Sequence, residues 1–222
     1  PVSCLPIPDE SYAAITSEGG YNPKDPPPEQ HPDLNLAVRE YRVTNAEKRL
    51  VDYGGPTDGG APQLRGLFVD RRIPDFRTVY QVYSWDWGNQ HPGPPEPNWP
   101  VTLAGLATAA GETIHVPESG YDIGLLANGY AVMVLYASPG QITLKYTRED
   151  NVERGYTLHV EGICVEPELL ALYESLNAAG RKRLPALRAG QAIGRASGPE
   201  IRVAVRDAGS FMDPRSRKDW WR

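Results

Sequence analysis

A short stretch near the C-terminus, SGPEIRVAVRD at 197–207, carries two side chains that could do chemistry. Its alternating pattern is that of a β-strand, with apolar residues on one face and Glu200 and Arg202 on the other. The neighbours of this glutamate and this arginine decide what role the two side chains can have.

Sequence elements on both sides of this strand have a characteristic order and spacing. Residues 189–194 (AGQAIG) precede it, residues 197–199 (SGP) lead into it, and residues 212–214 (MDP) follow it. Together they resemble the closing segment of the lysostaphin-type, or LytM-like, zinc metallopeptidases. In that family a V-x-x-G-Q-x-I-G turn leads to G-P-H-L-H-F-E-V-R and then to a V-D-P ending.

Two earlier elements resemble the remaining landmarks of the family, in the expected order. ESGYDIG at 118–124 resembles H-x-G-x-D-I, and GYTLHVE at 155–161 resembles G-Y-x-T-L-Y-A-H. The resemblance covers about 101–216 and implies a β domain of the duplicated hybrid motif type. Residues 1–100 match no pattern of the family.

The resemblance also implies a zinc site, but most of its ligands are replaced. Of the expected His, Asp and His ligands only Asp122 is kept, because Glu118 replaces the first histidine and Arg202 the last. Arginine is always charged and has no lone pair to offer a metal. Glu161 and Glu200 replace the two flanking histidines. We therefore expect no zinc, no other cofactor and no catalytic residues of the family's kind.

The replaced residues are expected to form a new cluster. In the purely structural interpretation, the carboxylates of Glu118, Asp122, Glu161 and Glu200 converge on the guanidinium of Arg202. Their salt bridges would fill the cleft that the resemblance implies and keep it folded. Three alternatives remain open: an oxygen-liganded cation such as calcium, an acid–base hydrolase using paired carboxylates as glycosidases do, and a binding groove inherited from the peptidase. Tyr156 and His159 are the candidates to line such a groove.

The composition limits the classes of partner. The net charge is −5 and no basic face is evident, which argues against a nucleic-acid binder. No apolar stretch is long enough for a membrane span, and no signal peptide is visible. The chain begins with proline and not with an initiator methionine, so we interpret it as a processed mature form or a trimmed chain.

The two cysteines, Cys4 and Cys164, lie far apart in the sequence. Two buried free thiols would be the plain interpretation. We favour a disulfide, because Cys4 lies in a proline-rich arm that has little else to hold it in place. A disulfide implies an oxidising compartment, and therefore a secreted, extracellular or cell-surface protein.

The pattern of elements predicts a mostly β, antiparallel fold with one inserted helix. Residues 101–222 form the LytM-like domain, with strands separated by turn residues and a helix at about 167–179 that begins near Pro167 and stops at Gly180. Residues 1–100 form an irregular extension rich in proline and glycine, with short strands expected at 34–43, 49–53, 66–69 and 78–87.

The last of these short strands carries an aromatic row, Tyr80, Tyr83, Trp85 and Trp87. Such a row can stack on sugars, but in a β-rich protein it is more often core or inter-strand packing.

The leading functional hypothesis is a secreted bacterial pseudo-peptidase that binds cell-wall peptide or glycan, or a protein partner. One alternative is a structural subunit of a surface layer, sheath or filament that self-assembles through its β scaffold and proline arms. A second alternative is a hydrolase with carboxylate-based chemistry. Fold alone does not decide among them.

Overall fold

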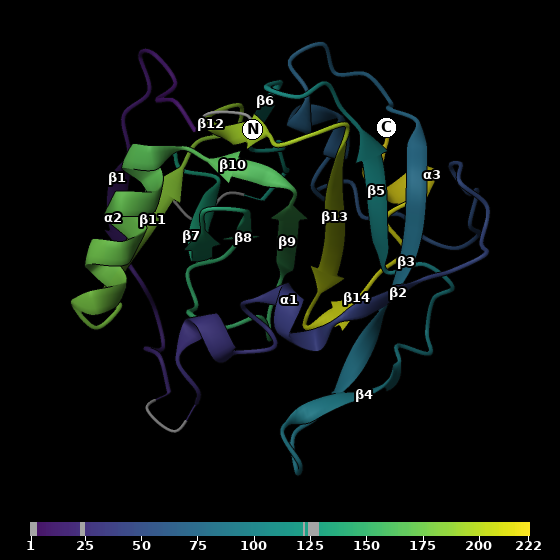
Figure 1. The fold of residues 1–222 in the computed structure, drawn as a ribbon, viewed down its shortest axis with the longest axis horizontal. Helices are drawn as coiled ribbons and strands as arrows, with labels where there is room; N and C mark the ends of the chain where they lie inside the picture. Colours follow the sequence, from purple (N-terminus) through teal and green to yellow (C-terminus); the bar gives the residue numbers. More distant parts are fainter. Residues whose placement is uncertain (1–3, 23–24, 122, 124–128) are drawn as a thin grey trace.

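A computed structural model describes residues 4–22, 25–121, 123 and 129–222. The fold is mostly β and antiparallel, as the sequence predicts (Figure 1). Its strands are β1 (Ala13–Thr16), β2 (Tyr41–Val43), β3 (Phe76–Asp86), β4 (His91–Pro95), β5 (Leu103–Ala107), β6 (Thr113–His115), β7 (Val132–Ser138), β8 (Gln141–Lys145), β9 (Tyr156–Glu161), β10 (Ile163–Val165), β11 (Arg183–Leu187), β12 (Ala192–Ala196), β13 (Glu200–Asp207) and β14 (Ser210–Phe211). Its helices are α1 (Leu36–Arg39), α2 (Pro167–Ala178) and α3 (Arg217–Trp220), with 3-10 turns η1 (Pro28–Gln30) and η2 (Leu64–Leu67).

One large sheet organises the molecule, in the order β1-β11-β7-β8-β9-β13-β5-β3-β2. Strand β14 pairs with β13 and β4 pairs with β3, while β10, β12 and β6 form a second, three-stranded sheet. In Figure 1, α1 and β14 lie near the lower ends of β9 and β13. The segments that carry the predicted motifs, β9 and β13, are therefore neighbours in the middle of the sheet.

The inserted helix forms where the sequence predicts it. The Glu166 side chain caps the first turn of α2 by accepting a hydrogen bond from the Leu169 backbone N–H, and Pro167 fills the first helical position, where no N–H is needed. Gly180 follows the helix with a φ of +91°, a conformation that terminates helices and that glycine adopts without strain. Leu169 and Tyr173 are the residues of α2 that are buried.

Residues 1–100 are built into the same sheet as the rest of the chain. They supply β1 at one edge and β3, which lies between β5 and β2 at the other. The strand expected at 34–43 is replaced in its first half by α1, because the Asn35 side chain accepts from the Ala37 N–H and caps a helical turn. The strand expected at 66–69 overlaps the 3-10 turn η2 instead.

The main hydrophobic core lies against one face of the large sheet. It gathers apolar side chains from β5, β7, β8, β9 and β13, including Leu106, Leu144, Val160 and Val203. The C-terminal tail closes this core: Trp220 and Trp221 are 2% and 3% exposed. A smaller apolar cluster lies elsewhere, made of Leu36, Val82, Leu103, Ala204 and Phe211.

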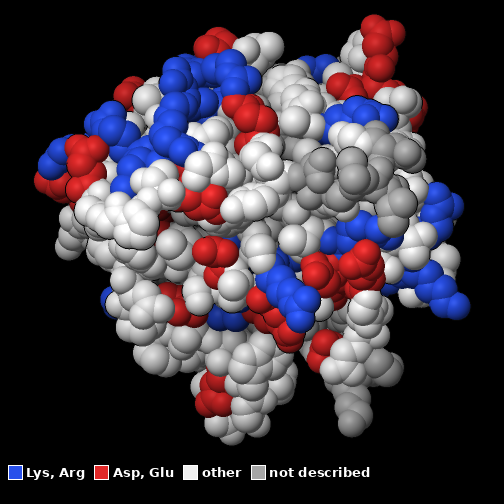
Figure 2. All heavy atoms as spheres, turned by 180° about the vertical axis from the view of Figure 1, so that it is seen from behind, with Lys and Arg blue, Asp and Glu red and all other residues white. Residues whose placement is uncertain are grey.

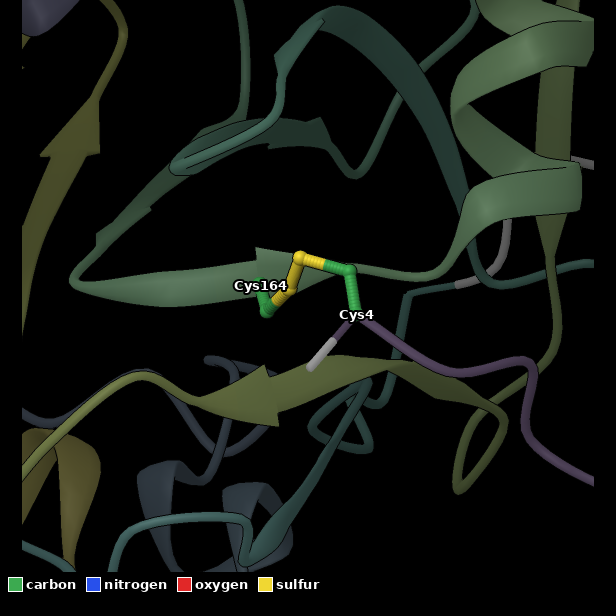
Figure 3. Close-up of a disulfide and its surroundings, with 2 residues drawn as sticks. All are labelled: Cys4 and Cys164. Carbon is green, nitrogen blue, oxygen red and sulfur yellow. A yellow bond between two sulfur atoms is a disulfide. The ribbon is translucent and has the colours of Figure 1, made fainter. Parts of the chain in front are cut away.

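The predicted disulfide is present. Cys4 and Cys164 are bonded, with their Cα atoms 5.4 Å apart, and the bond fastens the N-terminal arm to β10 (Figure 3). In the chain-entropy model a cross-link across 160 residues contributes about 5 kcal/mol. The disulfide therefore fixes the N-terminal arm at Cys4, which lies before the first strand and belongs to no strand.

Two surface properties follow from the described residues. None of their helices is both long and apolar enough to cross a bilayer. Acidic and basic side chains are interspersed over the face of the molecule seen in Figure 2.

Candidate functional site

Strands β9 and β13 present two different faces, and their register fixes which residues share a face. Arg202 pairs with Glu161, and Asp207 pairs with Tyr156. Because side chains alternate along a strand, Glu161 and Arg202 point to one side of the sheet and Tyr156 and Asp207 to the other. We call the first the covered face (Thr143, His159, Glu161, Arg202 and Arg206) and the second the cavity face (Tyr156 and Asp207).

The predicted site strand contributes an ion pair on the covered face. Arg202 Nε lies 3.2 Å from Glu161 Oε2, and the same carboxylate oxygen accepts a hydrogen bond of 2.9 Å from the Tyr41 hydroxyl. The Tyr80 hydroxyl donates to Glu200 Oε1 over 3.1 Å. The rings of Tyr41 and Tyr80 meet edge to face at 5.3 Å, and the Arg202 guanidinium lies 5.5 Å from the Tyr41 ring centre. We call these five residues the Arg202 cluster.

A glycine on the neighbouring strand makes room for one of the carboxylates. Gly105 on β5 pairs with Arg202, and a Cβ at this position would collide with the carboxylate of Glu200. Any larger residue at 105 would therefore displace Glu200 from Tyr80. The absence of a side chain at position 105 leaves the room that the cluster needs.

Hydrogen bonding in the Arg202 cluster is incomplete. The side chain of Glu161 is 5% exposed, and its Oε1 has no hydrogen-bond partner among the described residues; the same is true of Arg202 Nε, whose approach to Glu161 is that of an ion pair. Burial raises the pKa of Glu161, outweighing the hydrogen bond from Tyr41 and the charge of Arg202. The Arg202 side chain is 33% exposed, and Tyr41, Tyr80 and Glu200 are half-buried, so solvent reaches the cluster on that side.

The chain before β2 lies over the part of the covered face that contains Thr143 and Arg206. Thr143 donates to the Leu34 carbonyl over 2.6 Å. Asp33 lies 2.9 Å from Arg206 Nη1 and 2.6 Å from Arg39 Nη2, and both arginine side chains are nearly fully buried. Burial alone would raise the pKa of Asp33, but the two guanidinium groups lower it to about 2.

His159 lies under this cover and lines no groove. It is 1% exposed, with Nδ1 3.0 Å from Thr143 Oγ1 and its ring stacked on Phe211 at 6.3 Å. Burial, and then the charge of Arg206, hold the pKa of His159 well below its usual range, so the ring is neutral. The expected groove position of His159 is therefore wrong, because α1 and β14 cover that face.

Tyr156, the other expected groove residue, lies on the cavity face. Its hydroxyl donates to Asp58 Oδ2 over 2.7 Å, and it borders a cavity of about 330 Å³ together with Asp207 and Tyr121. Tyr156 and His159 thus lie on opposite sides of β9 and do not form one groove.

The structure also separates Glu118 from the Arg202 cluster. Glu118 forms an ion pair with Arg71, and its backbone carbonyl accepts from the Gln63 N–H over 2.9 Å. Ser119 donates to the Gly60 carbonyl, which further ties this loop to the segment around η2. Glu118 borders another cavity of about 430 Å³, with His115. Asp122, the remaining predicted carboxylate, lies outside the described residues.

The described residues therefore do not fit a zinc site of the peptidase kind. Arg202, at the position where the motif resemblance implies a ligand, has no lone pair for a metal. Glu161 is engaged by Arg202 and Tyr41, and Glu118 is engaged by Arg71. Within the described part of the chain no group of three or more His, Cys, Asp or Glu side chains is arranged to hold a metal ion. Of the four carboxylates expected to converge, the described structure brings Glu161 and Glu200 together.

Comparison with known proteins finds a likeness at the level of structure and none at the level of sequence. No protein-family model and no curated protein sequence matches the chain. A solved structure described as a zinc containing peptidase from Vibrio cholerae is similar over 69% of this chain, with 14% identity and a TM-score of 0.36. This chain spans 39% of that peptidase.

Several residues that build the two faces are absent from the motif analysis. Asp33, Tyr41 and Asp58 all come from residues 1–100, where no family pattern gives a register. Tyr80 does belong to the aromatic row of β3, and its position supports the packing interpretation of that row, since its ring contacts Tyr41. The alternation of β3 could have placed Tyr80 on one face, but not opposite Glu200.

Proposed function

We propose that this chain is a non-catalytic, secreted binding protein with a LytM-like β domain, whose ligand is cell-wall peptide or glycan, or a protein partner. The observation that carries the proposal is the Arg202 cluster, in which Arg202 pairs with Glu161 at a position where the motif resemblance implies a zinc-ligating histidine. A guanidinium cannot ligate a metal, and it is a good partner for a carboxylate. The chemistry of the position favours binding over hydrolysis.

The state of hydrogen bonding in the cluster supports a binding role. Arg202 is partly exposed, while Glu161 Oε1 and Arg202 Nε lack hydrogen-bond partners among the described residues. An unmet buried donor or acceptor costs about 1–3 kcal/mol, which a ligand group or an ordered water would recover. A ligand carboxylate could pair with the exposed part of the guanidinium, as carboxylates of cell-wall peptides would.

Sedimentation with purified bacterial sacculi tests this proposal. The wild-type chain should pellet with sacculi, should stay in the supernatant without them, and should release no fragments. Arg202→Gln should reduce the bound fraction roughly tenfold, because it removes a charge-assisted pair. Arg42→Gln is the matched control, since Arg42 is an exposed arginine on β2 that contacts Gln81.

The other outcomes separate the alternatives. Sedimentation without sacculi would overturn the proposal in favour of a self-assembling structural subunit. Released fragments would overturn it in favour of a carboxylate-based hydrolase. Equal loss of binding in Arg202→Gln and Arg42→Gln, with both variants folded by circular dichroism, would remove the Arg202 cluster from the binding site.

A further inference from the structure

The cavity face carries a pocket that the motif analysis does not use. It has a volume of about 330 Å³ and is lined by Asp58, Tyr121, Tyr146, Thr147, Gly155, Tyr156 and Asp207. Tyr156 and Asp207 point into it from neighbouring positions on β9 and β13. The pocket lies on the opposite side of these strands from the Arg202 cluster, so it is a separate site.

One of its two carboxylates is held in a fixed position. Asp58 accepts hydrogen bonds from the Tyr156 hydroxyl at 2.7 Å, from the Tyr121 hydroxyl at 3.0 Å and from the Gly60 N–H at 2.8 Å. Burial acts to raise the pKa of Asp58, but these hydrogen bonds lower it below its usual value. Asp58 is therefore ionised near neutral pH and its orientation is set.

The other carboxylate has no such partners. No hydrogen bond or ion pair of the Asp207 side chain is found among the described residues, and the nearby charges that act on it are those of Asp58 and Lys145. Lys145 is fully buried and its ammonium donates to the Arg154 carbonyl. Burial and the charge of Asp58 raise the pKa of Asp207. The pocket thus contains an oriented carboxylate and an unpaired one.

Aromatic rings form the walls around these carboxylates. Tyr121 and Tyr156 lie 6.1 Å apart with their planes tilted by 37°, and Tyr121 is 48% exposed at the outer edge. The Tyr121 ring can approach because residue 60 is glycine: a Cβ there would lie 2.7 Å from the ring. The tyrosine faces offer contact to methylene groups and an electron-rich surface to a cation.

We propose that this pocket binds a basic side chain of a peptide, a lysine ammonium or an arginine guanidinium carried on its aliphatic stem. The cation would pair with Asp207 and approach Asp58, while the stem packs against the exposed surfaces of Tyr121 and Tyr156 that line the pocket. Two like charges in one pocket repel each other, and a bound cation relieves that repulsion. The proposal does not depend on the function of the Arg202 cluster, because the two sites share no described residue.

Titration of the full chain with small probes tests the pocket. The probes are Nα-acetyl-lysine methylamide and its arginine analogue, with Nα-acetyl-norleucine methylamide as the neutral probe of similar shape, followed by isothermal calorimetry or ligand-observed NMR. The cationic probes should bind roughly tenfold or more tightly than the norleucine probe, and the difference should shrink as salt is added. Equal binding of the neutral probe, or no binding of either cationic probe, would overturn the proposal.

Two variants locate the effect. Asp207→Asn should weaken binding of the lysine probe roughly tenfold, whereas Asp75→Asn, which changes an exposed carboxylate before β3, should leave it unchanged. Tyr121→Ala should weaken it several-fold through loss of one wall. Unchanged affinity in Asp207→Asn, with the fold intact by circular dichroism, would contradict the assignment. If that variant does not fold, the comparison of charged and neutral probes on the wild-type chain still decides the question.

Discussion

Successive side chains of β9 and β13 alternate between two faces, and the carboxylates on these faces have opposite kinds of neighbour. On the covered face, Asp33, brought in by the chain before β2, is in contact with two buried arginines. On the cavity face, Asp207 lies beside a second carboxylate, Asp58, and not beside a partner cation in contact with it. Asp33 thus belongs to a structural ion network, whereas Asp207 has a carboxylate that a ligand could engage.

The directions of the pKa shifts express the same difference. The pKa of Asp33 is lowered to about 2, so its charge stabilises the folded state. The pKa of Asp207 is raised, so its charge is less favourable in the folded chain than in the unfolded one. Buried ionisable groups whose pKa is shifted can mark either structure or function, and here the partners distinguish the two cases.

The largest expected effect comes from breaking the covered face at Asp33. Asp33→Ala would leave Arg39 and Arg206 buried without their shared carboxylate, and removing one partner from a buried ion network costs about 3–5 kcal/mol. Equilibrium unfolding in urea measures this loss. Asp75→Ala, at an exposed position, is the control and should change stability by less than about 0.5 kcal/mol. A loss below about 1 kcal/mol in Asp33→Ala would show that the two faces do not differ as described.

The acid dependence of stability gives the next effect. Because the folded pKa of Asp33 is lowered, its contribution is fully present above about pH 4 and is lost as the pH falls towards 2. The expected loss from this group is about 2 kcal/mol. Unfolding free energies measured from pH 5 to pH 2 should show it in the wild-type chain and not in Asp33→Asn. Identical profiles for the two proteins would assign the acid lability to other groups.

A smaller effect is expected in the Arg202 cluster, which is only partly buried. Arg202→Met should destabilise the fold by about 1–2 kcal/mol, because Glu161 would remain buried without its cation. Adding Glu161→Gln should recover much of that loss. The coupling energy from the double-mutant cycle of unfolding free energies is the measurement. Strictly additive losses would mean that the two side chains do not stabilise each other.

The smallest effect is expected on the cavity face. Asp207→Asn should change the unfolding free energy at pH 7 by no more than about 0.5 kcal/mol, and in the stabilising direction, because it removes a charge that folding disfavours. Thermal unfolding measures this change against the wild type. A strong destabilisation would reveal a structural role for Asp207 and would weaken the contrast with Asp33.

Local pattern was enough to predict the central strands and the helix α2, but not every short element and not the long-range contacts. Alternation with turn residues located β7, β8, β9 and β13, and a proline followed by an apolar stripe located α2, because these signals depend on neighbours in the sequence. The helical turn α1 was missed, because the capping side chain of Asn35 outweighs the strand-like composition around it.

The candidate site shows the same limit at the level of side chains. The motif order was sufficient to place Glu161 and Arg202 on neighbouring strands, where they meet. It was insufficient for Glu118, whose loop is fixed by Gly60, Gln63 and Arg71 from a segment with no family pattern. Residues 1–100 also supply Tyr41 and Asp58, so the partners of both faces come from the part of the sequence with the weakest local signal.

The disulfide between Cys4 and Cys164 also changes how the chain would respond to a protease. It closes a ring that contains β1 to β9, including the segment before β2 that lies over the covered face. A single cut in any loop within that ring would open it without releasing a fragment. The two pieces would migrate together on a non-reducing gel and would separate only after the bond is reduced.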